Sequence, residues 1–324
     1  MTKPTLQPRQ GAIALQTANG QHQPVLIKTV VELLAVGPSP TYLDCTFGRG
    51  GHSQALLVNY PDCQVVAIDC DPEAQAKAHQ IRCDYPGRFE FHDCNFTDLD
   101  RLLKRDYHAI LFDLGVSSPM LDTPGRGFSF RFSAKPDMRL DPRIGTPASI
   151  FLETASWNDL VTAIRNYGEE RSWRRIVQAI IHARGSGLLQ DTVALAEHIA
   201  SIVPQSPGSR TRLHPATKAF QGIRMAVNGE LNALEQVLPK AMDRLLPGGL
   251  LAVISFHSLE DRIVKRFFRR MAGQPEHAWD SLPQDFRQHC ATILTPKPIT
   301  ATEDELRDNP RSRSAKLRVL RKDD

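Results

Sequence analysis

Residues 41–53 read TYLDCTFGRGGHS, and this stretch decides the fold. A short apolar run ends in Asp44 and passes directly into a cluster of three glycines, Gly48, Gly50 and Gly51. Glycine permits positive φ angles and lets the backbone approach a ligand closely. The pattern is therefore typical of a buried parallel strand that turns sharply into a helix in a doubly wound α/β sheet.

The spacing within this loop separates two kinds of cofactor site. The register D-x-x-x-G-x-G from Asp44 to Gly50 favours the loop of S-adenosylmethionine (SAM) methyltransferases. A dinucleotide fingerprint that starts at Gly48 would need glycine or alanine at position 53, where Ser53 stands. From the loop alone, an ordinary glycine-rich turn between a strand and a helix is the alternative.

The overall composition is that of a globular protein. The 324 residues suffice for two domains, or for one domain with a large insertion. A net charge of +4 permits a nucleic-acid partner without requiring one. No apolar run reaches the length of a membrane span, and the N-terminal residues contain no hydrophobic core of a signal peptide.

The cysteines indicate neither a metal site nor a disulfide scaffold. The chain has six cysteines, none in C-x-x-C spacing and none beside paired histidines. We therefore expect no metal, and a reducing cytoplasm as the location.

A second strand is predicted at residues 63–69, where a continuous apolar run ends in Asp69. Asp69 lies 18 residues after Gly51, close to the separation at which an acid binds ribose hydroxyls. The alternative is that Asp69 caps the next helix, but Asp71, directly before Pro72, suits that role better.

Two further strands complete the predicted cleft. Residues 89–92 form the third, and Phe96 after it either stacks on an adenine or belongs to the core. Residues 109–113 form the fourth, which ends in Asp113. Asp44, Asp69 and Asp113 would then lie at three carboxyl strand ends, where open α/β sheets bind ligands.

Residues 122–141 break the pattern with a long, irregular segment rich in arginine and phenylalanine. Long loops inside compact domains are usually functional. The interleaved Arg126, Phe128 and Arg139 suit an unpaired nucleic-acid strand, with guanidinium groups on phosphates and rings on bases. Equally, the phenylalanines could be core residues and the charges solvated.

Helical patterns follow, and no strand alternation appears before residue 204. We expect helices at residues 150–155, 157–166, 173–184 and 192–203, then a turn-rich linker with Arg210, Arg212 and His214. Residues 216–246 read as one long helix and residues 250–255 as a fifth strand. The next helix carries five basic residues between positions 262 and 270, and residues 309–319 add Arg311 and Arg313 around an edge strand.

The chain closely resembles the bacterial RsmH (MraW) family of SAM-dependent methyltransferases, which act on N4 of a cytosine in small-subunit ribosomal RNA. The resemblance covers about residues 22–320. The matching stretches are HQPVL (22–26), DCTFGRGGHS (44–53), DLGVSSP (113–119), RGFSF (126–130), DMRLD (137–141), YGEER (167–171), HPATKAFQ (214–221), VISFHSLEDRIVK (253–265) and NPRSRSAKLR (309–318).

This resemblance implies a Rossmann-like methyltransferase sheet with an inserted helical domain that helps to recognise RNA. The expected division is a flexible extension (1–21), a first part of the methyltransferase domain (22–136), the insertion (137–212) and a second part with a basic end (213–324). It also implies a small-ribosomal-subunit partner and leaves a homodimer open. The SAM contacts carried over are Gly50, Gly51, His52, Asp69, Phe96 and Asp113, with Gly48 from the loop register; Met120 stands where the family usually has glutamine.

The expected reaction needs alignment more than activation, because a sulfonium methyl group is already electrophilic. The cytosine amine is a poor nucleophile, and a hydrogen-bond acceptor on its N–H groups would assist it and take up the proton. Asp113 or nearby backbone carbonyls could serve; His257 is a second candidate, with a structural hydrogen bond as its alternative. The rival functions are a nicotinamide-dependent oxidoreductase and a non-catalytic ribosome-assembly factor.

Overall fold

The structure, a computed structural model, describes residues 23–101, 106–203 and 214–324. Its contacts divide the chain into two compact units: residues up to Gly115 together with Ala233–Asp324, and Val116–Asn232. We call them the sheet unit and the helical unit. None of the helices in the described ranges is long and apolar enough to cross a membrane.

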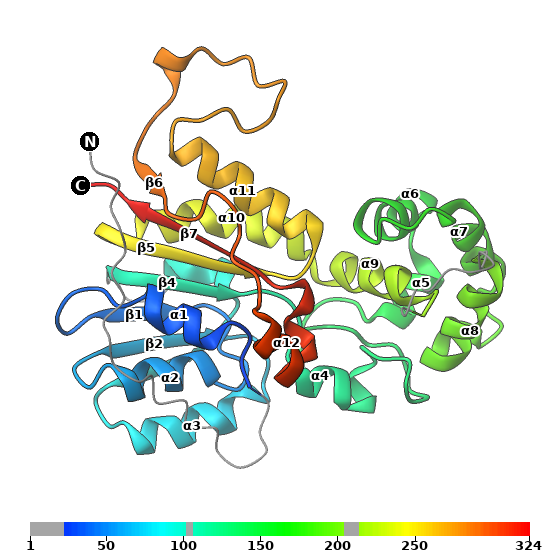
Figure 1. The fold of residues 1–324 in the computed structure, drawn as a ribbon. Helices are drawn as coiled ribbons and strands as arrows, with labels where there is room; N and C mark the ends of the chain where they lie inside the picture. Colours follow the sequence, from blue (N-terminus) through cyan, green and yellow to red (C-terminus); the bar gives the residue numbers. More distant parts are fainter. Residues whose placement is uncertain (1–22, 102–105, 204–213) are drawn as a thin grey trace. The chain divides into compact units, whose positions relative to one another are not determined.

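The sheet unit contains one seven-stranded sheet with the order β3-β2-β1-β4-β5-β7-β6 (Figure 1). Strands β1 to β5 run parallel, whereas β7 is antiparallel to β5 and β6 is antiparallel to β7. The strand order reverses between β1 and β4, which is where doubly wound sheets bind ligands. The strands are β1 (Thr41–Asp44), β2 (Gln64–Asp69), β3 (Phe89–Asp93), β4 (Tyr107–Asp113), β5 (Leu245–Ser255), β6 (Ala291–Ile293) and β7 (Lys316–Lys322).

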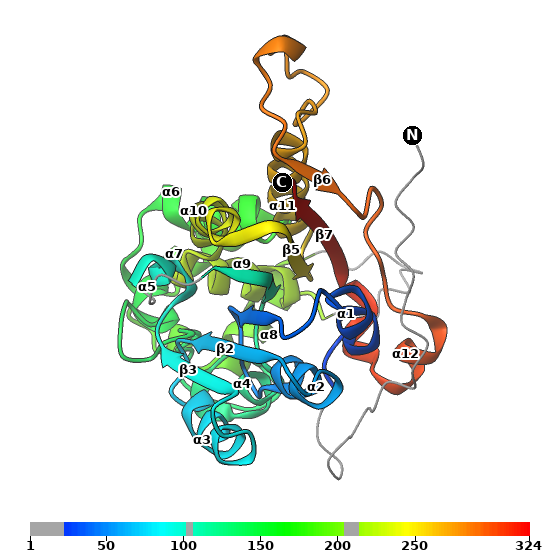
Figure 2. The same cartoon turned by 90° about the vertical axis from the view of Figure 1, so that its left-hand side faces the viewer.

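Helices cover both faces of this sheet, as Figure 2 shows from the side. One apolar core joins the sheet to α1, α2 and α3, and a second joins the other face to α10 and α11. Burial on both faces explains why the central strands are continuous apolar runs. The helices of this unit are α1 (Ile27–Leu33), α2 (Gly51–Asn59), α3 (Ala74–Asp84), η1 (Phe96–Arg101), α10 (Glu230–Asp243), α11 (Ser258–Met271), η5 (Gln284–Phe286), α12 (Glu303–Asp308) and η6 (Pro310–Ser314).

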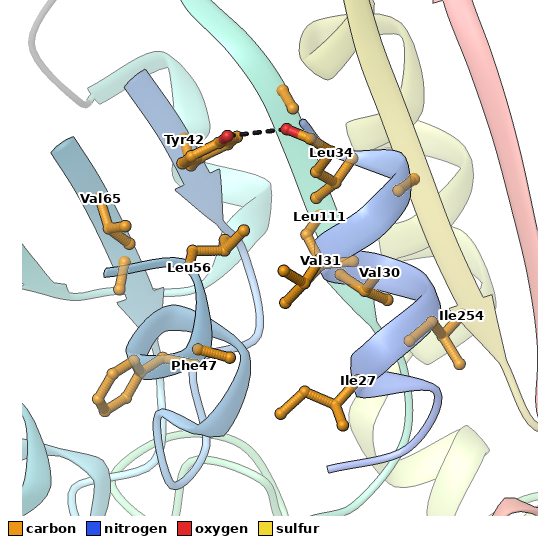
Figure 3. Packing of buried hydrophobic residues seen from close by; sticks show 14 of the residues in the cluster. Ile27, Val30, Val31, Leu34, Tyr42, Phe47, Leu56, Val65, Leu111 and Ile254 are labelled. Carbon is orange, nitrogen blue, oxygen red and sulfur yellow. Dashed lines mark hydrogen bonds between the residues drawn. The ribbon is translucent and has the colours of Figure 1, made fainter. Parts of the chain in front are cut away.

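Helix α1 fixes the N-terminal side of the sheet unit (Figure 3). Val30 and Val31 are buried in the first core, together with Leu111 and Ile254 of the sheet. The buried Tyr42 hydroxyl donates a 2.7 Å hydrogen bond to the carbonyl of Leu34, which ties the helix end to β1. Burial raises the pKa of Tyr42, so the hydroxyl stays protonated and able to donate.

The helical unit has its own apolar core, which explains its compactness. The four helices predicted before residue 204 are confirmed, with a π-helical turn extending the second. The elements are α4 (Ser118–Asp122), η2 (Pro124–Arg126), α5 (Ala148–Thr154), α6 (Trp157–Val161), η3 (Thr162–Tyr167), α7 (Trp173–His182), η4 (Leu188–Gln190), α8 (Thr192–Ile202) and α9 (Thr217–Asn228).

The prediction of one helix over residues 216–246 is wrong. Gly229 adopts a left-handed conformation (φ 60°) that ends α9, and α10 begins at Glu230. The apolar stripe continues across the break, which is why its periodicity hid it. Helix α9 belongs to the helical unit, which spans residues 116–232. The insertion expected from the sequence spanned residues 137–212.

The prediction of an edge strand near residues 309–319 is also wrong. Strand β7 lies inside the sheet between β5 and β6, and the short β6 forms the edge. Strand β6 has only three residues, Ala291–Ile293, too few to show a pattern in the sequence. The turn at Pro247-Gly248-Gly249 lies within β5 and does not precede it. It interrupts the pairing of β5 with β4, which resumes at Leu250.

We predict that Gly222→Ala destabilises the helical unit by about 3 kcal/mol through overpacking. A methyl group on Gly222 would lie 2.0 Å from the carbonyl oxygen of Ala163 and 2.6 Å from the amide of Gly168. Urea unfolding followed by fluorescence of Trp157 and Trp173, in a Trp279→Phe background, measures this unit.

The matched control is Gly125→Ala, because a methyl group there would meet nothing within 4 Å. We expect its free energy of unfolding to change by less than about 0.5 kcal/mol. Equal unfolding midpoints for the two variants would contradict the close crossing of α9 and η3.

Candidate active site

One loop, Cys45–Ser53, is bonded to acids at the ends of three parallel strands. At the end of β1, Asp44 is buried and accepts a 2.6 Å hydrogen bond from the Ser53 hydroxyl and a 3.2 Å bond from the Thr46 amide. Burial raises the pKa of Asp44 although these bonds oppose the shift. Asp44 therefore holds both ends of the loop.

Asp69, at the end of β2, holds the middle of the same loop. Its carboxylate accepts a 2.6 Å hydrogen bond from the Gly48 amide and a 2.8 Å bond from the Asp71 amide. Burial raises the pKa of Asp69 to about 6 despite both bonds. The carboxylate is thus ionised at neutral pH and retains lone pairs for further donors.

Asp113, at the end of β4, meets the loop through its backbone and its side chain. Its amide donates a 2.6 Å hydrogen bond to the Thr46 hydroxyl, and its Oδ2 lies 3.4 Å from Nε2 of His52. Burial alone would lower the pKa of His52, but the carboxylates of Asp113 and Asp44 outweigh it and raise that pKa. The His52 imidazole is therefore protonated more readily than an exposed histidine.

This pair contains buried polar atoms without hydrogen-bond partners. Both ring nitrogens of His52, which is 5% exposed, and Oδ1 of Asp113 have none within the described residues. Unsatisfied buried polar atoms are costly and call for an explanation. A ligand carrying a positively charged donor would satisfy Asp113 Oδ1, so the residues fit a cationic cofactor.

The glycines of the loop are required by conformation and by close packing. Gly48 and Gly50 have positive φ angles. A methyl group on Gly50 would lie 2.6 Å from the ring of Phe47, and one on Gly51 would lie 2.1 Å from Cγ of Pro24. The start of α2 is thus covered by the N-terminal segment that contains Pro24.

The C-terminal part of the chain holds this N-terminal segment in place. Glu305 Oε1 accepts a 2.5 Å hydrogen bond from the Leu26 amide, and Asn309 Nδ2 donates a 2.9 Å bond to the Gln23 carbonyl. Asn309 is buried, and its backbone carbonyl accepts a hydrogen bond from the Ser312 hydroxyl. We call Glu305 and Asn309 the terminal clamp.

Phe96 lies after β3 and is partly buried against the second core. Its ring meets Phe112 edge-to-face, with 5.8 Å between ring centres. The contact supports a core role for Phe96, and stacking on an adenine stays a prediction. The structure thus joins Gly48, Gly50, His52, Asp69 and Asp113 through direct contacts or one shared loop.

The predicted RNA residues of the irregular loop have partners within the helical unit. Arg126 donates hydrogen bonds of 3.0 and 2.9 Å to the carbonyls of Arg139 and Leu140. Phe128 is buried in the core of this unit, and Arg139 forms a two-bond pair with Asp137 at 2.8 Å. These contacts give the loop its shape, and an additional role in RNA contact stays a prediction.

Other predicted residues are distributed between the two units. His214 is exposed and packs against Phe130, with 4.7 Å between ring centres. Arg311 and Arg313 are exposed on η6. Arg210 and Arg212 lie outside the described residues, as does the N-terminal extension 1–21.

His257 and Met120 both lie in surroundings that suit a structural role. The side chain of His257 accepts a 3.3 Å hydrogen bond from the Leu259 amide and caps α11, which supports the structural interpretation. Met120 is 5% exposed and belongs to the apolar core of the helical unit. Across the described ranges, no group of three His, Cys, Asp or Glu residues could hold a metal ion.

Sequence reasoning missed the residues that support the loop. Thr46 and Ser53 lie within the quoted glycine stretch, but nothing in their spacing showed that they bind the strand-end acids. The terminal clamp joins residues 279 and 286 positions apart, which no local pattern reveals. The only signal was that Gln23, Leu26 and Asn309 lie in stretches that match the family, whereas Glu305 lies outside them.

The chain is similar to known proteins over most of its length. The ribosomal RNA small subunit methyltransferase H of Thioalkalivibrio sulfidiphilus is 46% identical over 92% of this chain and 96% of its own length. That of Thermomicrobium roseum is 43% identical over 92% of each chain. A solved rRNA methylase from Streptococcus thermophilus covers 92% of this chain and 94% of its own, with 12% identity and a TM-score of 0.40, too weak a likeness to assign anything.

The family profile extends this similarity to almost the whole chain. The MraW methylase family matches residues 19–323, which include both compact units and the terminal clamp. With this match and with relatives above 40% identity over most of both chains, this protein belongs to the MraW methylase family.

Proposed function

We propose that this protein transfers a methyl group from SAM to the N4 amine of a cytidine in the RNA of the small ribosomal subunit. Its family and its relatives, which are named ribosomal RNA small subunit methyltransferase H, support this assignment. The observation that carries it is the glycine loop bonded to three strand-end acids, with a buried carboxylate oxygen of Asp113 left for a donor. Such an enzyme works in the cytoplasm, where ribosomal subunits are assembled.

The described residues fit SAM, which supplies an activated methyl group when bound. We assign the ribose hydroxyls to Asp69, whose ionised carboxylate can accept donors beyond the two amides it already binds. We assign the cationic amino group to Asp113, because its Oδ1 is buried without a partner. Phe96 would border the adenine, and Gly50 and Gly51, which pack against Phe47 and Pro24, would contact the cofactor through the loop backbone.

The chemical step depends on alignment and on an acceptor for one proton. The target cytosine must leave its base stack before its amine can reach the edge of the sheet. An acceptor on the amine N–H would make the nitrogen more nucleophilic and then receive the proton. We assign this role to the carboxylate of Asp113 or to the backbone carbonyls that follow it.

The RNA around the target needs basic and aromatic contacts. Arg311 and Arg313 are exposed in the sheet unit and suit phosphate groups. Exposed His214 and the loop that carries Arg126, Phe128 and Arg139 are the candidates in the helical unit.

The proposed function predicts that the protein methylates undermethylated small ribosomal subunits with labelled SAM. Mass analysis of the nucleosides should identify N4-methylcytidine, with naked rRNA and DNA as comparison substrates. SAM binding without transfer to any RNA would contradict the proposed substrate, and tight subunit binding without turnover would favour an assembly factor.

An Asp113→Ala protein with normal SAM affinity and full turnover would remove Asp113 from both of its roles.

We also predict that SAM affinity falls as the pH decreases through about 6, by up to about tenfold per pH unit below it. The pKa of Asp69 is raised from 3.8 to about 6 in the folded protein. Protonation of Asp69 therefore stabilises the folded protein in the absence of SAM. This contribution is complete below pH 3.8 and is lost as the pH rises through about 6. Ribose hydroxyls instead need the ionised carboxylate, so SAM binding must release the proton.

Isothermal calorimetry of SAM between pH 5 and about 7.5 measures this dependence. Asp69→Asn should bind more weakly and show a flatter profile. Asp62→Asn, in the exposed turn that precedes the same strand, should retain the wild-type profile. An unchanged profile in Asp69→Asn would assign the titration to another group, such as His52.

A separate prediction concerns the terminal clamp. Asn309→Ala removes the hydrogen bond to the Gln23 carbonyl and should loosen the segment that covers Gly51. At about 1 kcal/mol for one such bond, the dissociation constant of SAM should rise about fivefold. The neighbouring Asp308→Ala, at an exposed position, should leave it unchanged, and equal affinities in the two variants would separate the clamp from cofactor binding.

A further inference from the structure

Helix α11 carries a continuous basic stripe on the sheet unit. Its buried face consists of Val264, Phe267 and Phe268, which belong to the second core. The basic residues follow helical spacing away from this face, so that they form one row along the helix. The basic stripe comprises the exposed Arg262, Lys265 and Arg266, and the half-buried Arg269, whose Nε atom is buried.

The charges of Lys265 and Arg266, at the centre of this stripe, are not cancelled by the acids of the helix. Glu260 is buried and binds backbone amides at the start of α11. Asp261 is paired with Arg318 at 2.7 Å and with Lys316 at 3.4 Å. Within the described residues, Lys265 and Arg266 are exposed and form no ion pair. The stripe therefore presents a local positive field to solvent.

A projecting segment, residues 273–290, follows α11 directly and returns to β6. We call it the arm; in Figures 1 and 2 it extends beyond the end of the helix. At its centre Arg287 pairs with Asp280 through two bonds of 2.9 Å, and Asp280 also accepts from the Glu276 amide at 2.8 Å. The Arg287 guanidinium holds the pKa of the Asp280 carboxyl well below its usual range. The salt bridge between Arg287 and Asp280 thus gives the arm a defined shape.

This braced arm exposes large apolar side chains. Trp279 is 90% exposed, Phe286 75% and Leu282 50%. Large contiguous patches of exposed apolar surface mark interaction sites, and these three side chains lie within eight consecutive positions, 279–286. The acids nearest Trp279 are already paired, Asp280 with Arg287 and Glu276 with Arg270, so they repel a polyanion less than free carboxylates would.

The order of these elements connects the arm to the candidate active site. Strand β5 ends at Ser255, at the edge of the sheet that carries Asp44, Asp69 and Asp113, and α11 begins three residues later. Helix α11 has 14 residues and so runs about 20 Å away from that edge to the arm. A strand whose target base enters the site could therefore continue along the basic stripe.

We propose that the basic stripe and the tip of the arm form one surface for single-stranded ribosomal RNA, with phosphates on the stripe and an unpaired base stacked on Trp279. Charge complementarity favours RNA over an apolar protein partner, and an aromatic ring beside a basic track is how single strands are bound without sequence preference. The proposal rests on the proposed function, since it extends the substrate contact of the same enzyme.

The experiment compares two variants of the intact chain, Lys265→Ala/Arg266→Ala and Trp279→Ala. Methyl transfer to undermethylated small subunits is measured at saturating SAM, together with binding of a short oligouridylate over a range of salt concentrations. We expect both variants to raise the KM for subunits, Trp279→Ala by about fivefold or more, with kcat and SAM affinity unchanged. For the double variant, the slope of log K against log salt should fall by about 1.4, as expected for two lost single-strand contacts.

Two controls make these effects specific. Lys77→Ala/Arg82→Ala removes the same number of basic residues from α3, which covers the opposite face of the sheet, and should leave the salt slope unchanged. Trp279→Phe keeps an aromatic face and should retain the KM to within about threefold.

The outcomes separate this proposal from the proposed function. Wild-type transfer with an unchanged KM and salt slope in both variants would overturn the proposal and leave the function intact. Weaker subunit binding by Trp279→Ala, with unchanged oligouridylate binding, would assign the arm to a protein partner and overturn it as well. Failure of the wild-type protein to methylate any RNA would reject the proposed function, whereas the oligouridylate titration would still decide the surface.

Discussion

The site depends on one constraint: a single loop is bonded to acidic residues at the ends of three neighbouring parallel strands. Asp44 binds Thr46 and Ser53, Asp69 binds Gly48, and Asp113 binds Thr46 through its amide while its carboxylate lies beside His52. Parallel strands bring their carboxyl ends to one edge of a sheet, so acids far apart in the sequence can share one short segment. The Asp69 carboxylate, which would bind a ligand, therefore also shapes the backbone around it, and burial raises the pKa values of Asp44 and Asp69.

Much of this edge could be predicted from the sequence because its signals are local. A doubly buried strand is a continuous apolar run, and a sharp turn towards a ligand needs glycine, so β1, β2 and the loop were readable. The later part of the chain was less predictable. The break at Gly229 lies within a regular apolar stripe, and β7 lies inside the sheet only because the very short β6 pairs with it. The support from Glu305 and Asn309 joins opposite ends of the chain, and local patterns contain no information on such contacts.

The basic and aromatic residues show the limit of composition as a guide. Arg126 and Arg139 suit RNA by type, yet their guanidinium groups bind a backbone carbonyl and a carboxylate inside the helical unit. A guanidinium with several donors can shape a loop and still bind a phosphate, so internal contacts and RNA contacts are compatible. Helix α11 differs, because its basic residues lie opposite a buried apolar face and its nearest acids are already engaged. The loop and α11 differ in how exposed their charged groups are, and the sequence alone does not show this exposure.

The clamp at the chain ends has a consequence for biosynthesis. Glu305 and Asn309 hold the segment around Pro24, and β7 is inserted between β5 and β6, so the sheet unit needs residues as far along the sequence as Lys322. The helical unit is continuous from Val116 to Asn232 and can bury its core much earlier during translation. A nascent chain on the ribosome would therefore carry a folded helical unit beside an incomplete cofactor cradle. An enzyme built this way completes its cofactor cradle only after β7 and the two clamp residues have been synthesised.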